Sequence, residues 1–123
     1  MTRPLIIYCA DIGSVSKGNF GWARLVCHDR PECTVGQDIN DFADSISADL
    51  NNRHPVALGF ECPLFVPVAD DPSALTSARV GERDRAWSAG GGAGSLAVGL
   101  TETVWVLTKV RKQLQLSTEV HLC

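Results

Sequence analysis

The stretch IIYCADIGSVSKGNFGWARL, residues 6–25, constrains the fold of this chain more than any other segment. An apolar run rich in strand-forming residues, 5–9, is followed by an acidic residue, Asp11, and a loop of Gly, Ser, Lys and Asn. A second apolar run covers 20–27. Two such runs joined by a turn-forming loop are typical of an antiparallel hairpin. The sequence therefore predicts an opening hairpin whose first strand ends on a carboxylate.

A second carboxylate follows another apolar run. His54-Pro55 restarts the chain, and VALGF, residues 56–60, ends directly on Glu61. Ligands of α/β sheets gather at the carboxyl ends of the strands, so parallel neighbouring strands would bring Asp11 and Glu61 together. Paired carboxylates repel each other unless a cation lies between them, and Mg²⁺ prefers hard oxygen ligands. The pair therefore suits phosphodiester hydrolysis assisted by one or two metal ions.

A purely structural interpretation applies more readily to one acid than to the other. Asp before Gly favours a simple turn, so Asp11 taken alone is as readily a turn residue as a ligand. Glu is seldom buried without a partner, and GFECP is not a common turn sequence. The occurrence of both acids after apolar strands favours a functional pair.

Helical periodicity predicts two helices. The first begins at Asp38, a suitable N-cap, and shows one apolar face made of Ile39, Phe42, Ala43, Ile46 and Leu50. The second covers Ser95 to about Leu116, with a predicted buried stripe of Leu96, Leu100, Thr103, Leu107, Val110 and Leu114. Charged residues lie off this stripe, at Glu102, Lys109, Arg111 and Lys112, and they argue against a membrane span. Trp22 and Trp105 are predicted to be core residues.

The sequence patterns that predict the remaining strands are weaker. Only CTV, residues 33–35, supports a strand between the hairpin and the first helix, and TEVHLC, residues 118–123, alternates weakly like a last strand. The order is strand, strand, helix, strand, long loop, helix, strand. This order predicts one α/β domain over 1–123, with a mixed sheet flanked by helices.

The long loop, residues 63–95, is rich in Pro, Gly, Asp and Arg, although SALTSARV within it is compatible with a short helix. Loops of this length are uncommon in compact domains and tend to be lids or binding loops. Arg83 and Arg85 offer forked donors for phosphate, and Lys17 in the first hairpin loop is a further phosphate candidate. Asp84 and Glu82 would offset much of this charge, so a solvated, self-paired loop is the alternative.

Net charge and cysteine content limit which partners and which cellular compartment are expected. Lys and Arg total 11 against 14 Asp and Glu, a formal net charge of −3, so a nucleic-acid partner would require a local basic patch or metal ions. The five cysteines form no CxxC pair, and the chain opens without the pattern of a secretory signal. These features predict a cytoplasmic protein.

Taken together, these segments resemble the ribonuclease H-like superfamily. D-x-G-S followed by G-W-A is similar to the first hairpin of Holliday-junction resolvases, and ALGFECPLF resembles their next acidic strand. GERDRAWSAGGGAG before a helix, followed by TEVHL, resembles a poorly characterised bacterial family of predicted ribonuclease H-like nucleases. The resemblance spans nearly the whole chain, and the order of the elements carries it more than any single motif.

The resemblance implies an Mg²⁺- or Mn²⁺-dependent nuclease that acts on DNA or RNA. Asp11 and Glu61 would be its first two metal-binding acids, and Asp84 an additional catalytic acid of the narrower family. Such nucleases place a further carboxylate after the last strand, whereas this sequence stops at Cys123. We therefore expect a chain truncated at its C-terminus, or a last acid supplied by Asp84 or Glu119. No membrane partner is expected, and a homodimer is left open.

Two other classes of protein fit the same residues. Actin and sugar-kinase relatives share the core topology and begin with an acid-glycine hairpin that cradles phosphate, but they need two such domains and 123 residues supply one. A non-catalytic ribonuclease H-like binding module is the other class. The acidic net charge and the absent terminal acid favour it.

Overall fold

The computed structural model describes residues 2–64, 66, 68–78, 81, 83, 86 and 91–115. In chain order the elements are β1 Leu5–Asp11, a 3-10 turn η1 Val15–Lys17, β2 Gly21–Cys27, β3 Glu32–Gly36, α1 Ile39–Asn51, β4 Val56–Glu61, a 3-10 turn η2 Pro72–Ala74 and α2 Gly91–Gln113. The strands form one mixed sheet in the order β3-β2-β1-β4, in which only β4 runs parallel to its neighbour. The α/β class and the opening hairpin are confirmed, whereas the strand predicted at 118–123 lies outside the described residues.

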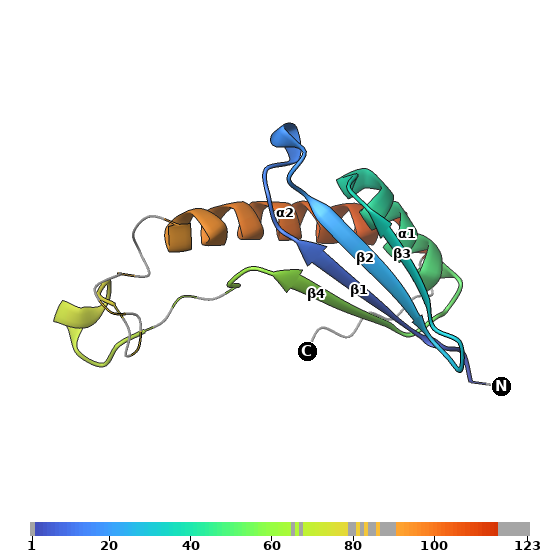
Figure 1. The fold of residues 1–123 in the computed structure, drawn as a ribbon, viewed down its shortest axis with the longest axis horizontal. Helices are drawn as coiled ribbons and strands as arrows, with labels where there is room; N and C mark the ends of the chain where they lie inside the picture. The colour runs from blue at the N-terminus through green and yellow to red at the C-terminus, as the bar shows by residue number, and fades with distance from the viewer. Residues whose placement is uncertain are drawn as a thin grey trace.

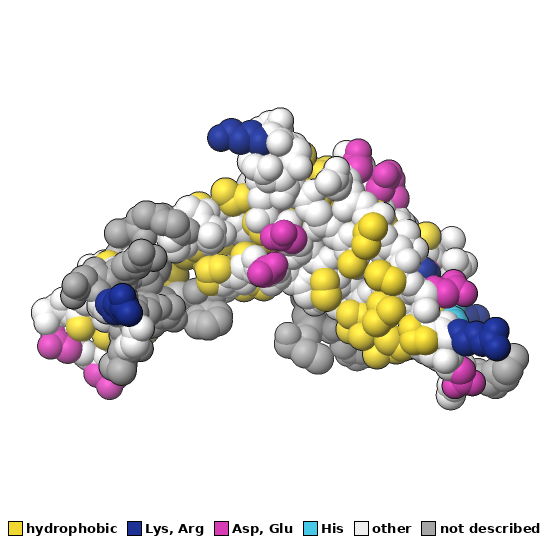
Figure 2. Space-filling view, viewed as in Figure 1, with side chains coloured by type: hydrophobic (Ala, Val, Ile, Leu, Met, Phe, Trp, Pro, Cys, Tyr) yellow, Lys and Arg dark blue, Asp and Glu magenta, His cyan; other side chains and the backbone are white. Residues whose placement is uncertain are grey.

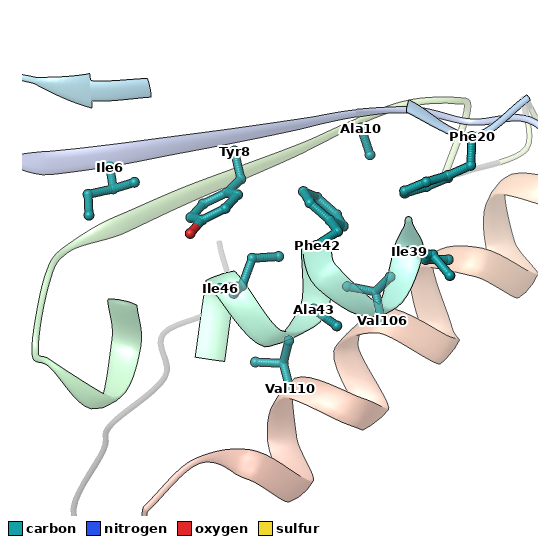
Figure 3. Packing of buried hydrophobic residues seen from close by; sticks show 10 residues of the cluster. All are labelled: Ile6, Tyr8, Ala10, Phe20, Ile39, Phe42, Ala43, Ile46, Val106 and Val110. Carbon is teal, nitrogen blue, oxygen red and sulfur yellow. The ribbon is translucent and has the colours of Figure 1, made fainter. Parts of the chain in front are cut away.

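Both helices cover the same face of the sheet (Figure 1). Side chains alternate along β1, and Ile6, Tyr8 and Ala10 point toward α1 and α2 (Figure 3). They form the core with residues of the helices and of the segment before β2, namely Phe20, Ile39, Phe42, Ala43, Ile46, Val106 and Val110. The opposite face of the sheet is not covered by the described helices, so the fold has two layers.

The first helix has the predicted start and the predicted buried face. Asp38 is its N-cap, and its carboxylate accepts hydrogen bonds from the backbone N–H groups of Asn40 and Asp41. Phe42 lies at the centre of the core and makes ring contacts with Tyr8 and other aromatic residues, Phe20, Trp22 and Phe60. The amphipathic pattern therefore located α1 correctly.

The second helix differs from the prediction in its start and in the face that it buries. It begins at Gly91 rather than Ser95 and ends at Gln113. Leu100 and Leu107, predicted to be buried, are 42% and 37% exposed, while Glu102, predicted to lie off the stripe, is 8% exposed. Trp105 is 41% exposed, so its assignment to the core is wrong. Apolar residues surround most of this helix, and α1 and β4 determine which of its sides is buried.

The third strand is better formed than its sequence indicates. β3 pairs with β2 in an antiparallel register that places Gly36 opposite Trp22. A Cβ atom at position 36 would lie 2.6 Å from the indole ring, so glycine is required for Trp22 to cover this strand. The indole Nε1 also donates to the backbone oxygen of Asp38 at 3.0 Å, which links β2 to the start of α1. Trp22 is partly buried against the core, in agreement with its predicted role.

A buried polar network lies between the sheet and α1, and the sequence analysis did not predict it. Asp49, 8% exposed, accepts hydrogen bonds from the Arg24 guanidinium and from the Tyr8 hydroxyl. Burial alone would raise the pKa of Asp49, but these hydrogen bonds outweigh burial and lower the pKa below its ordinary value. The network therefore holds a carboxylate ionised inside the protein.

The long loop contributes one short element to the described structure. The 3-10 turn η2 overlaps the start of the segment SALTSARV, whose last two residues lie outside the described residues. In Figure 1, η2 lies beyond the N-terminal end of α2, away from the four strands. No helix in the described part of the chain is both long and apolar enough to span a membrane.

Candidate functional site

Asp11 and Glu61 are direct neighbours across β1 and β4. The two strands are parallel, and their register pairs Asp11 with Glu61 at the last position of each strand. Neighbouring strands lie about 4.8 Å apart, and paired residues of a parallel ladder point to the same face. Both side chains are exposed. The prediction that β1 and β4 are parallel neighbours whose ends bring the two acids to the same edge of the sheet is confirmed.

The acid pair lies on the face of the sheet that the helices leave open. Asp11 alternates with Ala10, which points into the core, so its side chain points away from α1 and α2. An open pocket of about 970 Å³ covers this end of the face, and small residues, Cys9, Gly21, Ala23 and Gly59, contribute to its lining beside the two acids. Figure 2 shows hydrophobic side chains gathered over the strands on this face, with acidic side chains beside them.

The two carboxylates of Asp11 and Glu61 determine the chemistry of the pocket, since most of the other lining residues are small or apolar. Neither lysine nor arginine is among its lining residues, so no described side chain of the pocket neutralises the two acids. Carboxylate oxygens suit Mg²⁺ and Mn²⁺, and Mg²⁺ commonly binds through one or two carboxylates while keeping several waters. Asp11 and Glu61 therefore fit such an ion, although the described residues contain no group of three or more His, Cys, Asp and Glu placed to hold a metal.

The other predicted site residues do not join the pair within the described structure. Lys17 is exposed at the end of η1, and Arg83 is exposed in the long loop with a backbone φ of 55°. Neither lines the pocket. Asp84 and Arg85, and the alternative acid Glu119, lie outside the described residues.

A third acid, which the sequence analysis missed as a site residue, lies behind the ends of β1 and β4. Glu102 of α2 is nine-tenths buried. Its Oε2 atom is buried without a hydrogen-bond partner among the described residues. Burial raises the pKa of Glu102, and the nearby backbone N–H of Gly13 opposes part of that rise. The sequence signal that pointed to Glu102 was its position as a charged residue within the largely apolar sequence of α2.

The turn after β4 rests on the same part of α2. Cys62 directly follows Glu61, and a Cβ atom at Gly99 would lie 2.5 Å from the Cys62 Sγ atom. Burial raises the pKa of the Cys62 thiol, and the Glu102 charge adds to this effect. Gly99 of α2 therefore lies close to residues that follow both strand ends, Ile12 after β1 and Cys62 after β4.

Comparison with protein-family models, with curated proteins and with solved structures finds no match to this chain.

Proposed function

We propose that this chain is a ribonuclease H-like domain that hydrolyses phosphodiester bonds in DNA or RNA with the help of Mg²⁺ or Mn²⁺. The single observation that supports the proposal is the register of β1 and β4, which pairs Asp11 with Glu61 at the edge of an open pocket. The strand order β3-β2-β1-β4, with only β4 parallel to its neighbour, agrees with the fold that the resemblance implies. Asp84, Lys17, Arg83 and Arg85 remain proposed contributors to catalysis or phosphate binding.

Each part of the pocket has a role in this proposal. Asp11 and Glu61 would hold the divalent ion through their carboxylate oxygens. When bound, the ion would lower the pKa of a water ligand and offset the charge of the phosphodiester. The small side chains of Cys9, Ala23 and Gly59 leave space in front of the acids for the nucleic-acid backbone.

A non-catalytic binding module is the second candidate, and the composition of the pocket favours it. The described lining carries two acids and no cation, so without a bound metal ion the pocket would repel a polyanion. Such a module would bind neither metal nor nucleic acid through Asp11 and Glu61. Metal affinity therefore separates the two candidates.

The test is titration of the full chain with Mn²⁺ by calorimetry, for the wild type and for Asp11→Asn and Glu61→Gln. Each variant should lose at least about tenfold in affinity while its unfolding curve stays unchanged, because both acids are exposed. Glu32→Gln is the matched control, since Glu32 is an exposed acid at the start of β3, at the opposite end of the sheet. Equal Mn²⁺ affinity in wild type and Asp11→Asn would overturn the metal site.

Cleavage is measured separately, with labelled single-stranded and double-stranded DNA and RNA incubated with Mg²⁺ or Mn²⁺. The wild type should cut at least one of these substrates, and both acid variants should be inactive. A wild type that neither binds Mn²⁺ through the acid pair nor cuts any substrate would support the binding module instead.

A further inference from the structure

We infer that α2 is a dimerisation helix, which packs antiparallel against the α2 of a second copy of this chain. The contact is made through an exposed apolar stripe, here called the α2 seam, that consists of Ala97, Leu100, Val104 and Leu107. The inference does not depend on the proposed nuclease function. The α2 seam belongs to the helix layer, whereas the acid pair lies on the face of the sheet that the helices leave open.

The exposed surface of α2 is almost free of charge. From Gly91 to Thr108 the sequence contains one charged residue, Glu102, and that residue is buried. The sheet and α1 cover only one side of the helix, on which Val106 and Val110 lie. A solvated helix face normally carries charged residues, and a helix that is apolar all round is normally buried. α2 therefore has more apolar surface than α1 and the sheet cover.

The residues of the α2 seam recur at alternating spacings of four and three. Leu100, Val104 and Leu107 are 42%, 60% and 37% exposed, and Ala97, also exposed, extends the stripe toward the start of the helix. This spacing places side chains on one line that receives a second helix as knobs into holes. The next position of the same spacing is Arg111, where the apolar line ends. The α2 seam is thus a surface for one helix, about 15 Å long.

A second copy of α2 fits because the α2 seam is complementary to itself. In an antiparallel pair with its twofold axis between Leu100 and Val104, Leu100 lies opposite the partner's Val104. Ala97 then lies opposite the partner's Leu107, so the smallest side chain of the stripe meets a large one. Isologous dimers require a patch that is self-complementary in this way.

Charge favours the antiparallel orientation. The positions that flank the α2 seam, Thr101 and Thr108, carry no charge that would select a different helix. Parallel pairing would bring Arg111 next to the partner's Arg111, and like charges in contact destabilise an interface. Antiparallel pairing instead places the basic last turn, Arg111 and Lys112, beside the start of the partner's α2. η2 lies beyond that start (Figure 1), and its N-cap, Asp71, is an exposed acid. Opposite charges are therefore brought to the same ends of the pair.

Sedimentation equilibrium of the full chain tests the dimer. A single helix pair is a small interface, so we expect a Kd in the micromolar range and follow the wild type from about 1 to 500 µM. Val104→Lys should raise the Kd at least about tenfold, because it places a charge in the buried contact. Its fold should be unchanged, since Val104 is largely exposed in the monomer. Val98→Lys is the matched control: Val98 is also exposed, lies about 120° around the helix from Val104, and should leave the Kd unchanged.

The antiparallel register is tested with two further variants, Ala97→Glu and Leu107→Lys. Each should dimerise more weakly than the wild type. An equimolar mixture should associate at least about tenfold more tightly than either variant alone, because the new acid of one chain faces the new base of the other. Misfolding cannot produce such a gain on mixing.

Each result either supports or overturns the inference. A wild type that stays monomeric over the whole concentration range would overturn it, as would a Val104→Lys variant that dimerises as tightly as the wild type. Equal weakening by Val98→Lys would show that the α2 seam is not the interface. No gain on mixing Ala97→Glu with Leu107→Lys would overturn the antiparallel register.

Discussion

The Arg24 guanidinium on β2 donates two hydrogen bonds to the Asp49 carboxylate on α1, from Nε to Oδ2 at 2.8 Å and from Nη2 to Oδ1 at 3.0 Å. Tyr8 on β1 donates to the same carboxylate. Asp49 is almost fully buried, and the Arg24 side chain is 26% exposed. Arg24 and Tyr8 therefore join β2 and β1 to α1 through the Asp49 carboxylate, whose ionised form these hydrogen bonds stabilise.

Asp49→Ala should destabilise the protein by about 3–5 kcal/mol, because it leaves the Arg24 charge and the Tyr8 hydroxyl without their acceptor. Asp44→Ala is the matched control on the same helix. Its ion pair with Lys109, at 3.1 Å, is half exposed and should contribute less than about 1 kcal/mol. Urea unfolding of both variants measures the difference. Similar losses in the two would show that the Asp49 network adds little to stability.

Asp49 also predicts a loss of stability in acid. Its pKa is lowered in the folded protein, so the unfolded chain takes up the proton first as the pH falls. The stabilisation is fully present above the ordinary carboxyl pKa and disappears as the pH falls through the folded value. Unfolding free energies measured from pH 6 to pH 2 should decrease more for wild type than for Asp49→Asn. Parallel curves would contradict this prediction.

Glu102 predicts the opposite pH dependence. Burial raises its pKa in the folded protein, so its ionisation opposes folding as the pH rises through the folded value. Glu102→Gln carries no such group, and its stability relative to wild type should therefore be greater at pH 8 than at pH 5. Urea unfolding at the two pH values measures this change. A constant difference would mean that Glu102 has the same pKa in the folded and unfolded chain.

Gly36→Ala should destabilise the sheet by about 1–3 kcal/mol, because the new methyl group would overlap the Trp22 indole. Gly21→Ala provides the control in the adjacent strand. A Cβ atom at Gly21 meets nothing within 4 Å, and alanine should be neutral or slightly stabilising there. Thermal unfolding of the two variants should therefore differ in sign or clearly in size. Equal effects would mean that Trp22 moves aside at little cost.

Phe42→Ala should cost about 3–5 kcal/mol, since the ring is fully buried and contacts four other aromatic rings. Trp105→Ala should cost less than about 1 kcal/mol. Trp105 is 41% exposed and lies beside the ammonium of Lys109, 5.4 Å from the ring centroid. Denaturant unfolding compares them directly, and a larger loss for Trp105 would contradict the buried face of α2 described above.

The candidate site was predictable because its signal is local. An apolar run that ends on an acid can be read within six or seven neighbouring residues, and both Asp11 and Glu61 have this pattern. Their meeting required one further condition, parallel pairing of β1 and β4 in a register that aligns the two strand ends. The burial of Glu102 had no local signal, because α2 and the strands are distant in the sequence and pack together only in the folded protein.

The hairpin, the capped helix α1 and the strand that ends on Glu61 follow from local sequence, since alternation, helical periodicity and capping depend on neighbouring residues. The buried side of α2 follows only from tertiary structure, because apolar residues occur around most of that helix. Packing against α1 and β4 buries Val106 and leaves its neighbour Leu107 exposed. Tertiary structure also decided that Trp22 covers Gly36 and that Arg24 reaches Asp49. These contacts join segments distant in the chain, and their free energy exists only once the layers have come together.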